Sequence, residues 1–174
     1  MFNRFTILNF VFFQALWFAS VVAAGVYQLH WLAMLALVPM TVAAWLGPAR
    51  RADFTLAAVA VIVGLLLDNL WVELRILDFA HASNAPYWIG FLWYGMALSV
   101  NHSLAWFRDR RWLGPLVVGI FAPVTYLAGE RFGAVAVLNL ELTVVVALAW
   151  TVLFVGLTQL SFRLLPANSL KPAV

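Results

Sequence analysis

The sequence contains no cysteine among its 174 residues. This excludes disulfide bonds, thiolate metal sites and cysteine nucleophiles. Charged residues are also scarce, because they make up 10% of the chain, whereas a soluble domain carries about 25%. Apolar residues account for 66%, and the mean hydropathy is +0.98. The longest polar gaps run to roughly ten residues. Composition therefore predicts an integral membrane protein with a single membrane-embedded domain, residues 1–174.

The motifs of several enzyme classes are missing as well. We find no nucleotide-binding glycine loop, no serine-hydrolase motif and no HExxH metal motif. The three histidines are far apart, and topology places His102 on the opposite side of the membrane from His30 and His81. We therefore expect no metal and no cofactor. The net charge of +3 comes from bases scattered at segment ends, so no nucleic-acid partner is expected.

Six apolar segments follow one another, separated by turn residues and charges. The first has the basic start of a signal peptide. Its apolar run of about twenty residues is longer than the usual signal core, so we interpret it as an uncleaved helix. The expected fold is all-α, a bundle of six transmembrane helices at about residues 5–24, 31–46, 53–72, 87–107, 112–128 and 141–162.

The basic residues predict the orientation of this bundle. Six crossings place both termini on one side, and that side would hold Arg4, Arg50, Arg51, Arg108, Arg110, Arg111, Arg163 and Lys171. Basic loops favour the cytoplasm, so both termini are expected to be cytoplasmic. Most acids lie toward the other side, which indicates either an acidic outer vestibule or ordinary loop composition.

Asp68 interrupts the apolar run of the third segment before that segment has crossed a bilayer. A charge inside a membrane costs a few kcal/mol, which makes it a functional candidate. In a continuous helix Gly64, Asp68, Trp71 and Arg75 share one face, and Asn69 adjoins it. Asp68 and Arg75 would pair directly or through water, across about 10 Å. The alternatives are an outward-opening site for a proton or a headgroup, and a structural acid satisfied by a neighbouring helix.

Polar residues elsewhere are further candidates for ligand binding. Glu130 and Arg131 follow the fifth segment at the depth of Asp68, where they would either complete a charged cluster or form a solvated turn between two glycines. Tyr94 and Asn101 share a polar face of the fourth segment, which would serve ligand contact or helix packing.

Two single polar residues complete the candidate set. His102, near the cytoplasmic end of the fourth segment, would either relay protons or play a structural part. Gln14 lies near the middle of the first segment and is included with the candidates.

Prolines and tryptophans add two further patterns. Pro39 and Pro123 are each followed two residues later by threonine, and they predict helix breaks at matching places in two halves of the chain. Such breaks are typical of inverted-repeat transporters, although membrane helices also tolerate proline. Most tryptophans mark the two membrane interfaces. Three lie deeper and would either line an apolar ligand cavity or simply pack: Trp17, Trp93 and Trp150.

A family resemblance rests on five stretches: Phe13-Gln14-Ala-Leu-Trp17-Phe18, Leu66-Leu67-Asp68-Asn69, Pro86-Tyr-Trp88-Ile, His102-Ser-Leu-Ala-Trp106, and Ala122-Pro123-Val-Thr-Tyr126-Leu-Ala-Gly129. In these the chain resembles the bacterial membrane family catalogued as domain of unknown function 2878. The resemblance implies a small multi-pass protein of the bacterial inner membrane with no assigned reaction. The occurrence of such proteins beside fatty-acid-modifying enzymes favours lipid handling.

Three functional classes follow from these observations. The first is a protein that binds a lipid or hydrophobic ligand through an Asp68/Arg75 face, or assists a lipid-modifying enzyme. The second is a small proton-coupled secondary transporter. The third is a structural membrane subunit, and an intramembrane enzyme is a fourth, less favoured class. The expected partners are membrane lipids, with a membrane protein or a second copy of the chain as further options.

Overall fold

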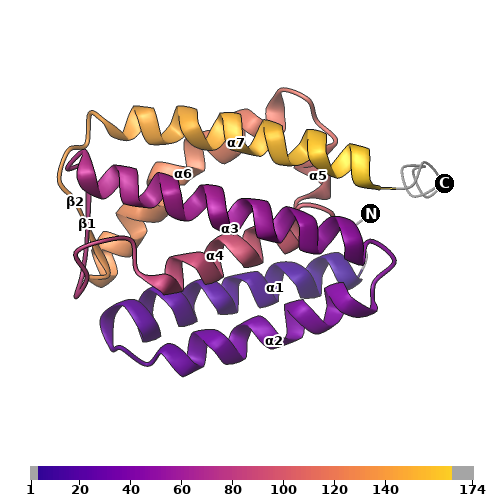
Figure 1. Ribbon diagram of the computed structural model, residues 1–174, viewed down its shortest axis with the longest axis horizontal. Helices are drawn as coiled ribbons and strands as arrows, with labels where there is room; N and C mark the ends of the chain where they lie inside the picture. Colours follow the sequence, from indigo (N-terminus) through magenta and orange to yellow (C-terminus); the bar gives the residue numbers. More distant parts are fainter. Residues whose placement is uncertain (1–3, 166–174) are drawn as a thin grey trace.

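The computed structural model describes residues 4–165 as a bundle of helices, most of which run along one long axis (Figure 1). The helices are α1 Arg4–Phe18, the π-helical η1 Ala19–Val26, α2 His30–Leu46, α3 Arg50–Glu73, α4 Tyr87–Ser99, α5 Ala105–Arg108, α6 Leu113–Phe132 and α7 Thr143–Leu164. The predicted helical class is confirmed. Lys171, which entered the topology prediction, lies outside the described residues together with both extreme ends of the chain.

Four helical segments are long and apolar enough to cross a membrane, namely α1 with η1, α3, α6 and α7. The apolar α2 has only 17 residues. A helix rises 1.5 Å per residue, so α2 extends about 26 Å, slightly less than a hydrocarbon core of about 30 Å. By length and composition, the chain is therefore built as a membrane protein with at least four candidate spans.

The outer surface of the bundle is apolar, as lipid contact requires. On α7 the side chains of Val144, Leu148 and Val152 are 60%, 62% and 71% exposed, and their spacing of four residues places them on one face. Water-soluble monomers rarely expose contiguous apolar surface on this scale. This face of α7 is therefore suited to acyl chains.

A short antiparallel ribbon closes one end of the bundle, and α5 lies at the other end (Figure 1). The ribbon consists of β1 Leu77–Phe79 and β2 Val135–Val137, with Asp78 opposite Ala136. Gly133 lets the chain enter β2, because it adopts a φ of 86° immediately after α6, a left-handed conformation that glycine adopts without strain. The ribbon thus joins the end of α3 to the end of α6.

Two expected segment ends are corrected by the structure. The helix expected over residues 87–107 ends at Ser99, and residues 100–104 form a turn before α5. We attribute the early end of this helix to the contacts of Asn101 and His102 with Asp53, described below. The turn expected at Glu130 and Arg131 is instead the last turn of α6.

The expected helix breaks at the prolines are also wrong. Pro39 lies within α2 and Pro123 within α6, and each helix continues across its proline. Threonine hydroxyl groups nearby bond to helix carbonyl groups, from Thr41 to Leu37 at 2.9 Å and from Thr125 to Ala122 at 2.7 Å. Membrane helices tolerate proline within their length.

Small residues on α3 bring α4 close to it at the centre of the bundle. Ala57, Ala60, Gly64 and Asp68 are buried in steps of three or four residues, so they form one stripe along the helix. Small side chains permit close approach of membrane helices. Asp68 is the last of these four residues and the one among them with an ionisable side chain.

Candidate functional site

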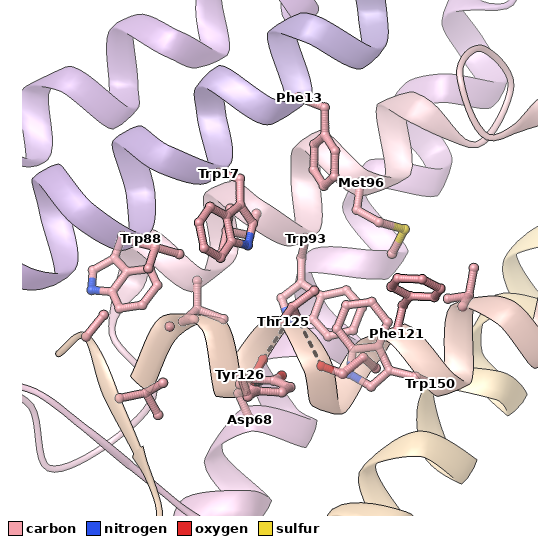
Figure 2. A pocket seen from close by; sticks show the side chains of 18 of the residues that line it. Phe13, Trp17, Asp68, Trp88, Trp93, Met96, Phe121, Thr125, Tyr126 and Trp150 are labelled. Carbon is pink, nitrogen blue, oxygen red and sulfur yellow. Dashed lines mark hydrogen bonds between the residues drawn. The ribbon is translucent and has the colours of Figure 1, made fainter. Parts of the chain in front are cut away.

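Asp68 lies at the meeting point of three helices. Its side chain is 0% exposed. The indole Nε1 of Trp93, on α4, donates a hydrogen bond of 2.7 Å to Oδ2, and the hydroxyl group of Tyr126, on α6, donates one of 2.5 Å to Oδ1. Figure 2 shows both donors converging on the carboxyl group. These two hydrogen bonds offset the cost of burying the polar carboxyl group.

Gly64 makes this arrangement possible, because the Trp93 ring lies directly against it. A Cβ atom at position 64 would overlap three ring atoms of Trp93 at well under 3.0 Å. Gly64 lies one helical turn before Asp68, so the absence of a side chain there leaves room for the indole to reach the carboxyl group. The glycine and the acid act together in holding Trp93.

Trp150 extends the aromatic surface onto α7. Its ring stacks on Trp93 with centroids 4.2 Å apart and an interplanar angle of 29°. Its Nε1 atom is buried and forms no hydrogen bond of ordinary geometry with the described residues, although the Tyr126 hydroxyl interacts with it loosely.

These residues line a cavity of about 180 Å³ inside the bundle. An engineered cavity of about 150 Å³ with apolar walls admits benzene, so this one has room for a single-ring molecule or a short branched chain. Figure 2 shows the side chains that surround it. The walls are mainly aromatic, with rings from α1, α4, α6 and α7 that include Trp17, Trp88, Trp93, Phe121, Tyr126 and Trp150.

The cavity wall contains an acidic group but no basic group among its described residues. Among the described residues that line it, Asp68 is the only one with an ionisable group of low intrinsic pKa, and none is lysine, arginine or histidine. Asp68 likewise has no basic partner within the described part of the chain. The site therefore offers a carboxyl group, two aromatic hydrogen-bond donors and many ring faces.

Arg75 does not take part in this site. α3 ends at Glu73, and Arg75 follows in a left-handed conformation with a φ of 55°. Its side chain is exposed, and residues 4–165 contain no ion pair between it and Asp68. The continuous helix that would place both residues on one face ends before Arg75. Trp71 is buried on α3 but does not line the cavity.

Two other candidates serve the scaffold around the cavity. Asn69 Nδ2 donates to the Leu65 carbonyl at 2.7 Å, and its Oδ1 accepts from the Ala85 amide at 3.2 Å, which fixes the loop before α4. Glu130 Oε1 accepts from the Val137 amide at 2.8 Å and so anchors β2. Arg131, beside it, is exposed.

Tyr94 and Gln14 also lie away from the cavity wall. The Tyr94 hydroxyl contacts Thr41 Oγ1 at 3.2 Å, which links α4 to α2. Tyr94 lines a shallow apolar groove between α2, α3 and α4. Gln14 is half-buried on α1 and does not line the cavity.

Asn101 and His102 meet in a second polar cluster, at the start of α3. Its centre is Asp53, which is 0% exposed. Asn101 Nδ2 donates to Asp53 Oδ1 at 2.8 Å, and His102 Nε2 lies 3.0 Å from Oδ2. Asn101 Oδ1 in turn accepts from Arg108 at 2.9 Å and from Ser161 at 2.5 Å. This cluster joins α3, the turn after α4, α5 and α7.

The sequence alone did not identify Tyr126 or Asp53. One signal was present for Tyr126, because a phenol in an apolar segment needs a hydrogen-bond partner and Asp68 was the only acid placed well inside a segment. Asp53 was placed at the start of the third segment and was not among the candidates, although the expected topology already placed it on the same side as Asn101 and His102. No metal-binding group of three or more histidine, cysteine or acidic residues occurs within residues 4–165.

A family model described as "Protein of unknown function (DUF2878)" matches residues 6–156, which confirms the resemblance seen in the sequence. No curated protein and no solved structure matches the chain.

Proposed function

The chain belongs to this family of unknown function, and we propose that it binds a small hydrophobic ligand inside its helical bundle, with Asp68 facing the ligand's polar end. The observation that carries the proposal is the aromatic cavity of about 180 Å³ with one buried carboxyl group in its wall. Ligand pockets generally combine apolar walls with a few convergent polar groups. A lipid-derived molecule, or one that partitions into lipid, fits this description.

The polar group matters more here than it would in a soluble protein. A ligand that enters from the bilayer leaves surroundings as apolar as the cavity, so burial of apolar area alone gives little preference for the bound state. Shape, ring contacts and hydrogen bonds must then supply the selectivity. In this cavity those contacts come from the stacked Trp93–Trp150 pair and from the Asp68–Tyr126 pair.

We also propose that the chain crosses a bacterial inner membrane six times, with both ends in the cytoplasm. Support comes from the placement of basic residues. The start of α1, the end of α7 and α5 lie at the same end of the bundle (Figure 1). Arg50 and Arg51 lie at the start of α3, and Arg110 and Arg111 follow α5. Basic residues gathered at one end favour the cytoplasm.

Filling the cavity tests the proposed function. Ala122 is 2% exposed and lines the cavity on α6, so Ala122→Phe should occupy the ligand space. The matched control is Ala58→Phe, because Ala58 is exposed on α3. Native mass spectrometry of protein released from nanodiscs should detect a small molecule retained by the wild type and by Ala58→Phe, and lost from Ala122→Phe. A wild type without a retained molecule, or a molecule that survives Ala122→Phe, would contradict the proposal.

A further inference from the structure

The two fully buried carboxyl groups of the bundle differ in their partners. Asp53 faces His102, which can supply a positive charge, and it also accepts from Asn101. Asp68 faces only the neutral donors Trp93 and Tyr126. An ionised group in a low-dielectric interior interacts strongly with an opposite charge. Within residues 4–165, Asp53 has a possible cationic partner and Asp68 has none.

The carboxylate of Asp68 has acceptor sites for further hydrogen bonds. A carboxylate has two oxygen atoms with about four lone-pair sites in total. One bond from Trp93 and one from Tyr126 occupy two of these sites. Asp68 also lines the cavity with a side chain that is 0% exposed, so its charge acts on a ligand in the cavity through space, across the two aromatic donors.

The aromatic rings of the wall attract cations, as the acid does. The faces of aromatic rings are electron-rich, and cations bind over the faces of tryptophan and tyrosine in particular. Trp93 and Trp150 present a stacked indole pair, and Trp17, Phe121 and Tyr126 add further rings. A phosphate or a fatty-acid carboxylate would find no basic side chain among the described residues of this wall. Anionic lipid headgroups are therefore poor occupants.

We infer that the cavity binds an organic cation with an apolar body, such as a substituted ammonium, with Asp68 as its counter-ion and the indole pair as its aromatic contact. This inference rests on the proposed ligand-binding function and names the chemical class of the ligand.

A pair of isosteric probes separates charge from shape. Phenyltrimethylammonium and tert-butylbenzene have the same outline, and only the first is charged. Both are single-ring molecules of the size that the cavity of about 180 Å³ can hold. Equilibrium dialysis against protein in nanodiscs, with empty nanodiscs as the blank, measures saturable binding of each probe above simple partitioning into lipid.

Asp68→Asn is the principal variant, because asparagine keeps the size of the side chain and removes its charge. Glu73→Gln is the matched control, since Glu73 is an exposed acid on the same helix. We expect one cation bound per wild-type chain, unchanged affinity in Glu73→Gln, and affinity at least about tenfold lower in Asp68→Asn. Binding of the neutral probe should not respond to Asp68→Asn.

A second variant keeps the test decisive if Asp68→Asn does not fold. Trp150→Leu leaves Asp68 and both its donors in place but removes one ring of the stacked pair. It should also weaken binding of the cation more than that of the neutral probe. Equal loss for the two probes, or unchanged cation affinity in Asp68→Asn, would overturn the inference.

The two proposals can fail separately. Saturable binding of tert-butylbenzene alone would leave the ligand cavity standing and overturn its preference for a cation. If neither probe binds saturably, and no retained molecule distinguishes Ala122→Phe from Ala58→Phe, the proposed ligand-binding function fails together with the inference.

Discussion

Replacing Gly64 with alanine would place one methyl group between α3 and the ring that bonds to Asp68. The new Cβ atom would overlap the Trp93 ring at well under 3.0 Å, so the ring must move. The ring carries the N–H group that bonds to Asp68 at 2.7 Å. Movement of Trp93 therefore disturbs both the packing of α4 on α3 and the hydrogen bond to the carboxyl group.

The size of the effect follows from three terms. Overpacking of a core typically costs about 1–3 kcal/mol. A side-chain hydrogen bond between membrane helices contributes about 0.6 kcal/mol on average and about 1.7 at most. Alanine favours a helix interior over glycine by about 0.5–1 kcal/mol. Together these terms predict that Gly64→Ala lowers the free energy of unfolding by about 1–4 kcal/mol.

Gly156→Ala provides the control for this measurement. Gly156 lies within α7, and a Cβ atom there would meet no described atom within 4 Å, so the substitution should stabilise the protein by about 0.5–1 kcal/mol. Unfolding in detergent micelles, followed by circular dichroism, compares the two variants. In a Trp93→Leu background the penalty at Gly64 should largely vanish, because the overlapping ring is gone. A Gly64→Ala protein as stable as Gly156→Ala would refute the packing argument.

Two further predictions concern the carboxyl partner and the topology. Tyr126→Phe removes the 2.5 Å hydrogen bond to Asp68 and should cost up to about 2 kcal/mol of unfolding free energy. Tyr94→Phe, which loses only a 3.2 Å contact, should cost less, and equal losses would contradict the reasoning. The chain has no cysteine, so single cysteines can be labelled cleanly. With a membrane-impermeant thiol reagent added to intact cells, Asp78→Cys should react and Arg111→Cys should not, whereas the reverse pattern would invert the proposed orientation.

Local composition predicted the helices, but contacts between distant segments could not be predicted in this way. The long apolar run that becomes α3 begins at two arginines and ends at Glu73, so its position could be inferred from the sequence. The expected fourth segment was too long because residues 100–107 are still partly apolar. The observed helix ends earlier, where Asn101 and His102 bond to Asp53, 48 and 49 positions away in the sequence. Asp68 and Arg75 share a face only in a helix that continues beyond residue 72, where the expected segment already ended, and α3 stops at Glu73.

The family resemblance was predictable for a different reason. It rested on short residue patterns spread along the chain, and the family model matches residues 6–156. Those patterns contain Asp68 and Tyr126, yet they do not show that the two side chains meet. The hydrogen bond between them joins positions 58 residues apart, and only packing of α6 against α3 brings them together.

The ribbon of β1 and β2 has a consequence for biogenesis. Leu77 pairs with Val137, so β1 stays unpaired during synthesis until all of α6 and β2 have been made. Tyr126 likewise reaches Asp68 only at that stage. Contacts of such sequence separation form late. A nascent chain that pauses after α4 would hold its intramembrane acid without the phenol, and with a strand edge unpaired. The ribbon can therefore close only after α6 is complete, and α7 is added to a bundle in which the acid and the phenol have already met.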